Sequence, residues 1–187
     1  MVPACRQLSR KVLPILEVSQ NGKSVWDTGE DQRVSESEDR FDSHTFILAK
    51  EGFSEGKHYW QVDVGQKKRW DLGIASESAH RKKEITLSPQ NGYWVIGYDD
   101  GIDYWARTEE WTHLGVSGKL KLTKIGIFLN VSARTLTFYN VLTKRKLHTY
   151  TTVGPGKLYP FFSTGSITKE LDKEQLTIES CKEVEDK

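Results

Sequence analysis

Apolar residues recur at every second position in several short runs of this chain. Trp60, Val62 and Val64 alternate with polar residues, and two later runs repeat the pattern with Trp70, Leu72, Ile74, Ile125, Ile127 and Leu129. A period of two is expected when one face of a β-strand is buried. No window of twelve residues shows a helical period. The pattern therefore predicts an all-β protein.

Turn-forming residues separate these runs at short intervals, among them Asn21–Gly22 and the segments 88–92, 99–101 and 154–156. Many short strands with such spacing predict an antiparallel sandwich or barrel. No unit of about 20–50 residues recurs, which argues against a propeller or a solenoid. The length of 187 residues suits one domain.

The same alternation divides the residues near the two central tryptophans into two sets. Trp60 and Trp70 share the parity of their aliphatic neighbours, so we expect both rings to fill the core. The residues that could bind a ligand are those on the other face of each strand or at the strand ends: His58, Gln61, Asp63, Asp71 and the turn 66–69.

Two segments lack a strand pattern. Residues 27–42 are charged and nearly without large apolar groups, which indicates an exposed loop. Residues 1–12 show no clear period, and both a short helix and an extended arm fit them.

Charge is balanced, with 27 basic and 26 acidic residues. No global field favours nucleic acid, and three basic clusters at 67–69, 81–83 and 144–146 are expected to be separate solvated turns. No run reaches the roughly 18 apolar residues of a membrane span, so no membrane insertion is expected. The two cysteines, Cys5 and Cys181, favour free thiols over a disulfide, and hence a reducing, cytoplasmic location.

The sequence holds no assembled catalytic or metal-binding motif. Its two cysteines and five histidines never stand at metal-ligand spacing, so no metal or cofactor is expected. A Gly-x-Ser-x-Gly nucleophile elbow is absent, and Gly154–Lys157 lacks the spacing of a phosphate-binding loop. Only one carboxylate, Asp63, stands where a sandwich glycosidase would place a pair. We therefore expect a non-enzymatic binding module whose loops carry specificity.

Seven blocks occur in order and at family spacing: "RFDS" (40–43), "EGKHYWQVDVG" (55–65), "RWDLGIA" (69–75), "NGYWVIGY" (91–98), "KIGIFLN" (124–130), "LTFYNV" (136–141) and "LYPFFSTG" (158–165). Over residues 13–180 the chain resembles the PRY-SPRY domain of tripartite-motif and butyrophilin-like immune proteins. The resemblance implies a bent, jelly-roll-like β-sandwich of two antiparallel sheets. It also implies an arm (1–12), a PRY part (13–57), an SPRY part (58–180) and a polar tail (181–187).

The resemblance further implies recognition of a folded protein or a peptide, as the target-recognition part of an immune or ubiquitin-pathway protein. The binding loops would be 27–42, 66–71, 97–105 and 164–170, and the family pocket falls by position on Asp71, Gly97, Asp99, Ser166 and Thr168. Tyr98, Trp105 and Trp111 are candidate aromatic anchors. For Trp105 and Trp111, core filling is the alternative.

A second function stays open at this point. Butyrophilin-like relatives bind phosphorylated metabolites in a basic pocket, and His58 together with the Lys and Arg clusters would have to converge to make one here. Calorimetry with a pyrophosphate compound would separate such a sensor from a protein-binding module. The sequence does not indicate an oligomeric state.

Overall fold

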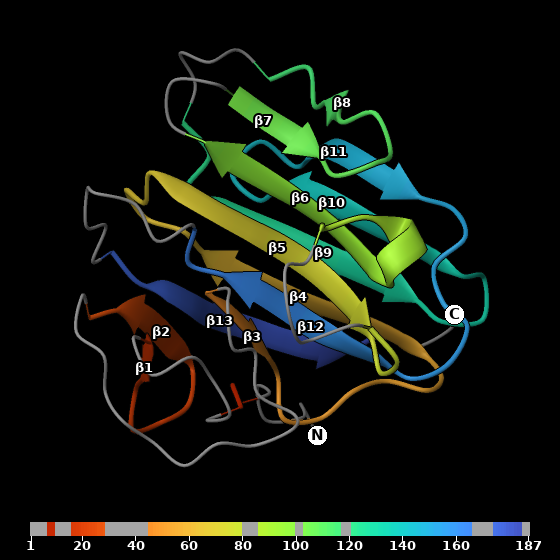
Figure 1. Ribbon diagram of the computed structural model, residues 1–187, viewed down its shortest axis with the longest axis horizontal. Coiled ribbons are helices and arrows are strands. Elements are labelled where there is room, and N and C mark those ends of the chain that lie inside the picture. The colour runs from red at the N-terminus through yellow and green to blue at the C-terminus, as the bar shows by residue number, and fades with distance from the viewer. Residues whose placement is uncertain are drawn as a thin grey trace.

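Two antiparallel β-sheets make up the computed structural model, which describes residues 7–9, 16–28, 45–79, 86–99, 103–116, 121–165 and 174–184. The larger sheet has seven strands in the order β1 (Leu16–Val18), β2 (Ser24–Asp27), β13 (Leu176–Glu183), β4 (Lys57–Asp63), β9 (Lys124–Asn130), β10 (Thr135–Asn140) and β11 (Arg145–Tyr150). The smaller sheet has six strands in the order β3 (Phe46–Leu48), β12 (Leu158–Ser163), β5 (Arg69–Ser76), β6 (Tyr93–Asp99), β7 (Asp103–Ala106) and β8 (Thr112–His113). One short 3-10 turn, η1 (Pro89–Asn91), precedes β6. The predicted all-β sandwich is confirmed (Figure 1).

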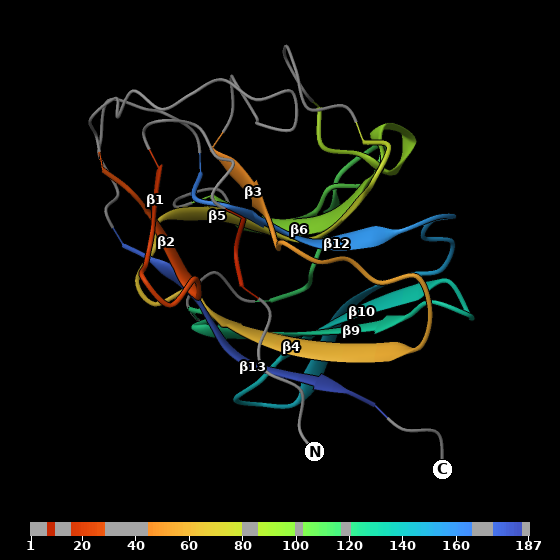
Figure 2. The ribbon, with the colours of Figure 1, turned by 90° about the horizontal axis from the view of Figure 1, so that it is seen from below.

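The two sheets stack as layers, with β4, β9, β10 and β13 in one and β3, β5, β6 and β12 in the other (Figure 2). The main core lies between them. Trp60 is 2% exposed and Trp70 is 1% exposed, and every aliphatic residue of the three alternating runs is buried with them. The parity prediction for both tryptophans is therefore confirmed.

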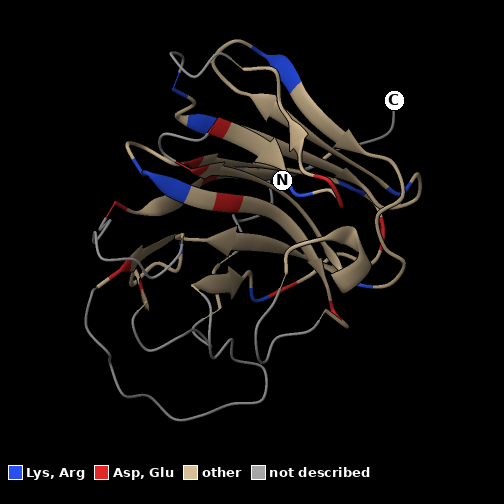
Figure 3. Cartoon of the chain, turned by 45° about the horizontal axis from the view of Figure 1, so that its top comes forward, with Lys and Arg blue, Asp and Glu red and all other residues tan. Residues whose placement is uncertain are grey.

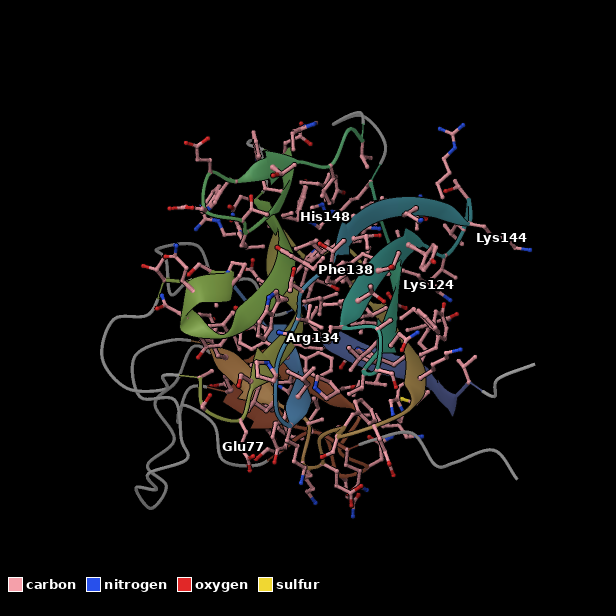
Figure 4. All side chains as sticks on the ribbon, turned by 90° about the vertical axis from the view of Figure 1, so that its right-hand side faces the viewer. Glu77, Lys124, Arg134, Phe138, Lys144 and His148 are labelled. Carbon is pink, nitrogen blue, oxygen red and sulfur yellow. The ribbon has the colours of Figure 1, made fainter. Side chains whose placement is uncertain are left out.

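A hydrogen bond from Tyr150 joins the two layers directly. Tyr150, at the end of β11, donates its hydroxyl to the backbone carbonyl of Val95 on β6 over 2.7 Å. Burial raises the pKa of this hydroxyl, against the effect of the bond to Val95. Phe138, labelled in Figure 4, packs edge-to-face on the Tyr150 ring in the core. The contacts fix the edge of the larger sheet over the middle of the smaller one.

The described part of the N-terminal arm is extended. Leu8 is buried in the main core and forms an isolated antiparallel bridge with Ala49. The short helix considered for residues 1–12 is not seen at residues 7–9, and the rest of that segment lies outside the described residues.

Two expectations for the C-terminal segment are wrong. β13 continues through Glu183, three residues into the expected polar tail, because Cys181 and its neighbours pair with β4. Cys181 is also disulfide-bonded, not a free thiol, and Cys5 is the only other cysteine in the sequence. Cytoplasmic location stays a prediction, without the support that free thiols would have given it.

The sequence predicts a fully solvated basic turn between β4 and β5, and this expectation is wrong at Lys67. Lys67 is buried, and its ammonium donates a hydrogen bond to the carbonyl of Glu174 over 3.0 Å. This contact ties the turn to the segment that leads into β13. Lys68, next to it, is exposed.

Candidate functional site

The candidate site lies on the face of the smaller sheet that points away from the main core. Alternate residues of a strand point to opposite faces. On β5, β6 and β7 the inward residues include Trp70, Ile96 and Tyr104, so Asp71, Gly97 and Trp105 face outward. The register places these last three side by side, because Gly97 is opposite Asp71 on one side and opposite Trp105 on the other.

Arg107 follows β7 directly and shares the parity of Trp105. Its backbone amide continues the pairing by donating to the carbonyl of Val95 over 3.0 Å. Its guanidinium forms an ion pair with Asp71, Nε to Oδ1 at 2.8 Å, and a longer one with Asp99, Nη2 to Oδ2 at 3.4 Å. The Arg107 side chain is only 6% exposed, against 13% for Asp71 and 25% for Asp99. A buried cation is thus bracketed by two carboxylates.

Gly97 makes this arrangement possible because it leaves the space under the ion pair empty. A Cβ at this position would stand 2.1 Å from Asp71 Oδ1 and 2.4 Å from Arg107 Nη2. Real atoms do not approach so closely, so any side chain here would displace the pair. The glycine is required for room and not for an unusual backbone angle.

Burial dominates the electrostatics of Asp71. It raises the pKa of the carboxyl to about 6, although the charge and hydrogen bond of Arg107 lower it; the Asp99 charge raises it further. Burial also disfavours the charged form of Arg107, but the two carboxylates outweigh this and raise the pKa of the guanidinium. Arg107 therefore stays charged while Asp71 titrates in the mildly acidic range.

Trp111 covers the guanidinium from the solvent side. The Arg107 Cζ atom lies 4.1 Å from the centre of the Trp111 ring, and the indole is 48% exposed. A cation–π contact at an exposed position contributes about 0.5–1 kcal/mol. The ring is thus a weakly held cover, and its outer surface is available for contact.

Two hydrogen-bond donors in this cluster lack an acceptor. Arg107 Nη1 and Trp105 Nε1 are buried, and neither has a partner among the residues that the structure describes. Buried donors are almost always paired in proteins, and each exception calls for an explanation. Both belong to the same outward-facing row.

A third carboxylate, that of Asp103, borders the cluster. Asp103 is directly opposite Asp99 in the pairing of β7 with β6 and has a positive φ of 134°, which is unusual for a residue other than glycine. His113 binds its carboxylate, Nε2 to Oδ2 at 2.7 Å. This hydrogen bond, with a weaker one from the Tyr104 amide, lowers the pKa of Asp103. Asp103 is therefore ionised wherever the domain is folded near neutral pH.

The structure brings together five of the residues named as candidates for the site: Asp71, Gly97, Asp99, Trp105 and Trp111. Tyr98 lies on the opposite face, where its ring packs between Trp70 and Tyr104. Ser166 and Thr168 lie outside the described residues, as do most of loop 27–42 and parts of loops 97–105 and 164–170.

Sequence reasoning missed Arg107, the residue around which the site is built. The signal was present, because Asp103, Trp105 and Arg107 alternate in "DYWAR" just as the inward residues do elsewhere. What the alternation could not show is that the Arg107 side chain crosses Gly97 to reach Asp71 on β5.

The predicted basic clusters do not converge in the described residues. Lys67–Arg69 lies at the start of β5, Lys144–Lys146 at the turn between β10 and β11, and 81–83 is outside the description. Figure 3 shows Lys and Arg positions scattered and interleaved with acidic ones, and Lys144 projects away from the body in Figure 4. His58 is occupied elsewhere, stacked on Phe53 and bonded to the Glu55 carbonyl.

The same described segments offer neither a metal-binding group nor a membrane-spanning helix. They contain no group of three or more His, Cys, Asp or Glu side chains able to hold a metal ion. Nor do they contain a helix of the length and apolar character that crossing a bilayer requires.

Comparison with known proteins places this fold among related chains. Tripartite motif-containing protein 72 of Xenopus laevis is 37% identical over 176 residues, covering 84% of this chain and 36% of that protein. The human erythroid membrane-associated protein is 38% identical over 149 residues, covering 80% of this chain and 31% of that protein. The chain thus spans about a third of the length of these curated relatives.

Solved structures agree on the fold. A stonustoxin structure superposes with a TM-score of 0.78 at 26% identity, covering 93% of this chain and 28% of that chain. The crystal structure of the TRIM65 PSpry domain superposes with a TM-score of 0.72 at 18% identity, covering 94% of this chain and 89% of that chain. Residues 12–53 match the family model of the SPRY-associated domain, PRY, and residues 57–178 match that of the SPRY domain. The chain belongs to the PRY-SPRY family.

Proposed function

We propose that this chain is a non-enzymatic module that binds a protein partner on the outer face of β5, β6 and β7. The observation that carries the proposal is the buried Arg107 guanidinium, held between Asp71 and Asp99 with one nitrogen still lacking an acceptor. A purely structural ion pair gains little from such an arrangement, since a buried unpaired donor destabilises the fold. A partner that supplies an acceptor for Arg107 Nη1 would remove this cost on binding.

The surroundings of Arg107 have the composition of a protein-binding site. Trp and Arg are enriched among the residues that dominate binding energy at protein interfaces. Here Trp105 and the exposed Trp111 flank Arg107, and Asp99 and Asp103 form a polar border. The sheet beneath them is rigid, since its inward residues are packed in the main core.

The length of the relatives supports a role for this module within a larger protein. The tripartite-motif protein of Xenopus laevis and the human erythroid protein are each about three times as long as the matched region. We propose that this module supplies target recognition to such a protein, in an immune or ubiquitin-linked context, and has no catalytic activity of its own.

The experiment compares proteins captured from cell lysate by the wild-type chain and by two variants. Trp111→Ala removes the exposed indole over Arg107. Leu142→Ala is the matched control, because Leu142 is also a large exposed apolar residue, 67% exposed, but lies after β10 on the other sheet. We expect captured proteins that are lost with Trp111→Ala and retained with Leu142→Ala. Equal capture by all three chains would place the interaction elsewhere and overturn the proposed site.

A further inference from the structure

The two unpaired donors of the site stand together. Trp105 and Arg107 are two positions apart and project from the same face, and both lie next to Gly97: Trp105 by strand register and Arg107 by lying across it. Trp105 Nε1 and Arg107 Nη1 are both buried without an acceptor in the described part of the chain. Arg107, the more deeply buried, is 6% exposed. Both donors therefore lack an acceptor on the row of outward-facing residues next to Gly97, and one carbonyl oxygen between them or two neighbouring ones would satisfy them.

The charges around these donors decide which acceptor fits. Asp71 and Asp99 already bind the guanidinium of Arg107, so its single positive charge faces two carboxylates. Asp103 adds a third carboxylate opposite Asp99 and is bound by the His113 ring, and among the described residues Arg69, opposite Asp99, faces the same row. A phosphate or a carboxylate would add negative charge beside these acidic groups. A neutral carbonyl oxygen satisfies the donors without that repulsion.

We propose that Arg107 Nη1 and Trp105 Nε1 together hold the carbonyl oxygen of an amide group of a partner polypeptide. This inference rests on the proposed function and names the chemistry that the site recognises. The amide belongs either to the partner's backbone or to an Asn or Gln side chain. Asp99, which is 25% exposed, can accept a hydrogen bond from the N–H of the same or a neighbouring amide.

Trp111 has to move for this contact to form. Its ring lies over the guanidinium; the partner chain takes that place, and the displaced indole packs against the bound partner. The indole is half exposed and held by one cation–π contact, so the exchange removes little from the folded protein. The site is thus covered when empty and opened by the ligand.

The probe is a random-sequence linear peptide library displayed on phage and selected on the 187-residue chain. Peptides that bind the wild type and not Trp111→Ala are synthesised, and their affinities are measured for two further variants. Trp105→Phe removes the indole N–H while keeping an aromatic ring. Trp60→Phe is the matched control, because Trp60 Nε1 is also buried without a described partner. Trp60 lies on β4 of the other sheet and points into the main core, away from the site.

We expect Trp105→Phe to weaken peptide binding about five- to tenfold, as the loss of one hydrogen bond does, and Trp60→Phe to leave it unchanged. In wild-type protein the Trp105 indole N–H resonance should shift downfield on peptide addition, while that of Trp60 stays in place. If the carbonyl oxygen belongs to an Asn or Gln side chain, replacing that residue of the peptide by alanine should abolish the shift of the Trp105 indole resonance. If the carbonyl oxygen belongs to the peptide backbone, a thioamide at that one peptide bond should abolish the shift.

Several outcomes would overturn the inference. If the selected peptides bind only through a carboxylate or a phosphate, the acceptor at this site is an anion and the proposed neutral carbonyl is wrong. Failure to enrich any peptide would exclude a linear amide ligand, while the proposed function would still stand if the lysate partners depend on Trp111. Enriched peptides that bind Trp105→Phe as tightly as wild type, without an indole shift, would leave the binding face intact and remove its assigned chemistry.

Discussion

The guanidinium of Arg107 lies directly over Gly97, with Nε and Nη2 placed 2.7 Å and 2.4 Å from where a Cβ of residue 97 would be. This relationship links three strands, since Arg107 follows β7, crosses Gly97 on β6 and ends on Asp71 of β5. The Arg107 side chain therefore forms the floor of the candidate site, and glycine at position 97 leaves the room that it occupies.

Gly97→Ala should destabilise the protein by about 1–3 kcal/mol, as overpacking of a filled site does. The added methyl group forces Arg107 and Asp71 apart and breaks their 2.8 Å contact. In an Arg107→Ala background the same change should cost clearly less, because one of the clashing groups is gone. Denaturant unfolding of the four proteins of this cycle measures the difference.

Gly73→Ala is the control for that cycle. Its Cβ would stand 2.1 Å from the backbone carbonyl oxygen of Trp94, which cannot rotate away. Its cost should be the same with or without Arg107. If the cost of Gly97→Ala were also independent of Arg107, the glycine would serve another purpose.

The titration of Asp71 should appear in the pH dependence of stability. Its folded pKa of about 6 lies above the ordinary 3.8, so between these values the folded state holds a proton that the unfolded chain has lost. Stability contributed by this group therefore falls as pH rises through that window and levels off above it, by about 1.4 kcal/mol for each unit of pKa difference.

The measurement is the free energy of unfolding of wild type minus that of Asp71→Asn, from pH 4 to pH 7.5, because all other titrating groups are shared. This difference should decrease with rising pH. An increase would mean that Arg107 holds Asp71 ionised despite burial, with a lowered pKa.

Trp60→Ala should cost about 3–5 kcal/mol, a large part of the roughly 5–15 kcal/mol that stabilises a typical domain. Trp60 is 2% exposed between the sheets, and its removal leaves a cavity. Trp111→Ala, on the surface, should cost about 1 kcal/mol or less. Thermal melts of both variants test the contrast, and a melt of Trp60→Ala within a few degrees of wild type would contradict the core assignment.

Lys67→Met should destabilise the protein by about 1–3 kcal/mol, since the Glu174 carbonyl that Lys67 binds is left without that donor. Lys68→Met, at the exposed neighbouring position, should stay within about 0.5 kcal/mol of wild type. Urea unfolding of the pair compares them. Equal stabilities of the two variants would mean that Lys67 is solvated, as the composition of the turn predicts, and that its bond to Glu174 adds no stability.

The strands and the core could be predicted because they depend on a local pattern. Alternation alone assigned Trp60 and Trp70 inward and Asp71 outward, since a strand has only two faces. Tyr98 was assigned to the site by its aromatic character, yet its parity with Trp70 across the β5–β6 pairing puts it in the core. Parity was the better guide there, because burial follows the face of the strand and not the residue type.

The sequence by itself determined the all-β fold, the family resemblance and the outward direction of Asp71, while the face of Trp105 stayed open. Only the tertiary structure decided that Arg107 crosses Gly97, that Lys67 is buried and that Cys181 is in a disulfide. These contacts join residues far apart in sequence or on neighbouring strands through long side chains. Strand periodicity fixes the direction in which a side chain leaves the backbone, and packing against the neighbouring strands decides where that side chain ends.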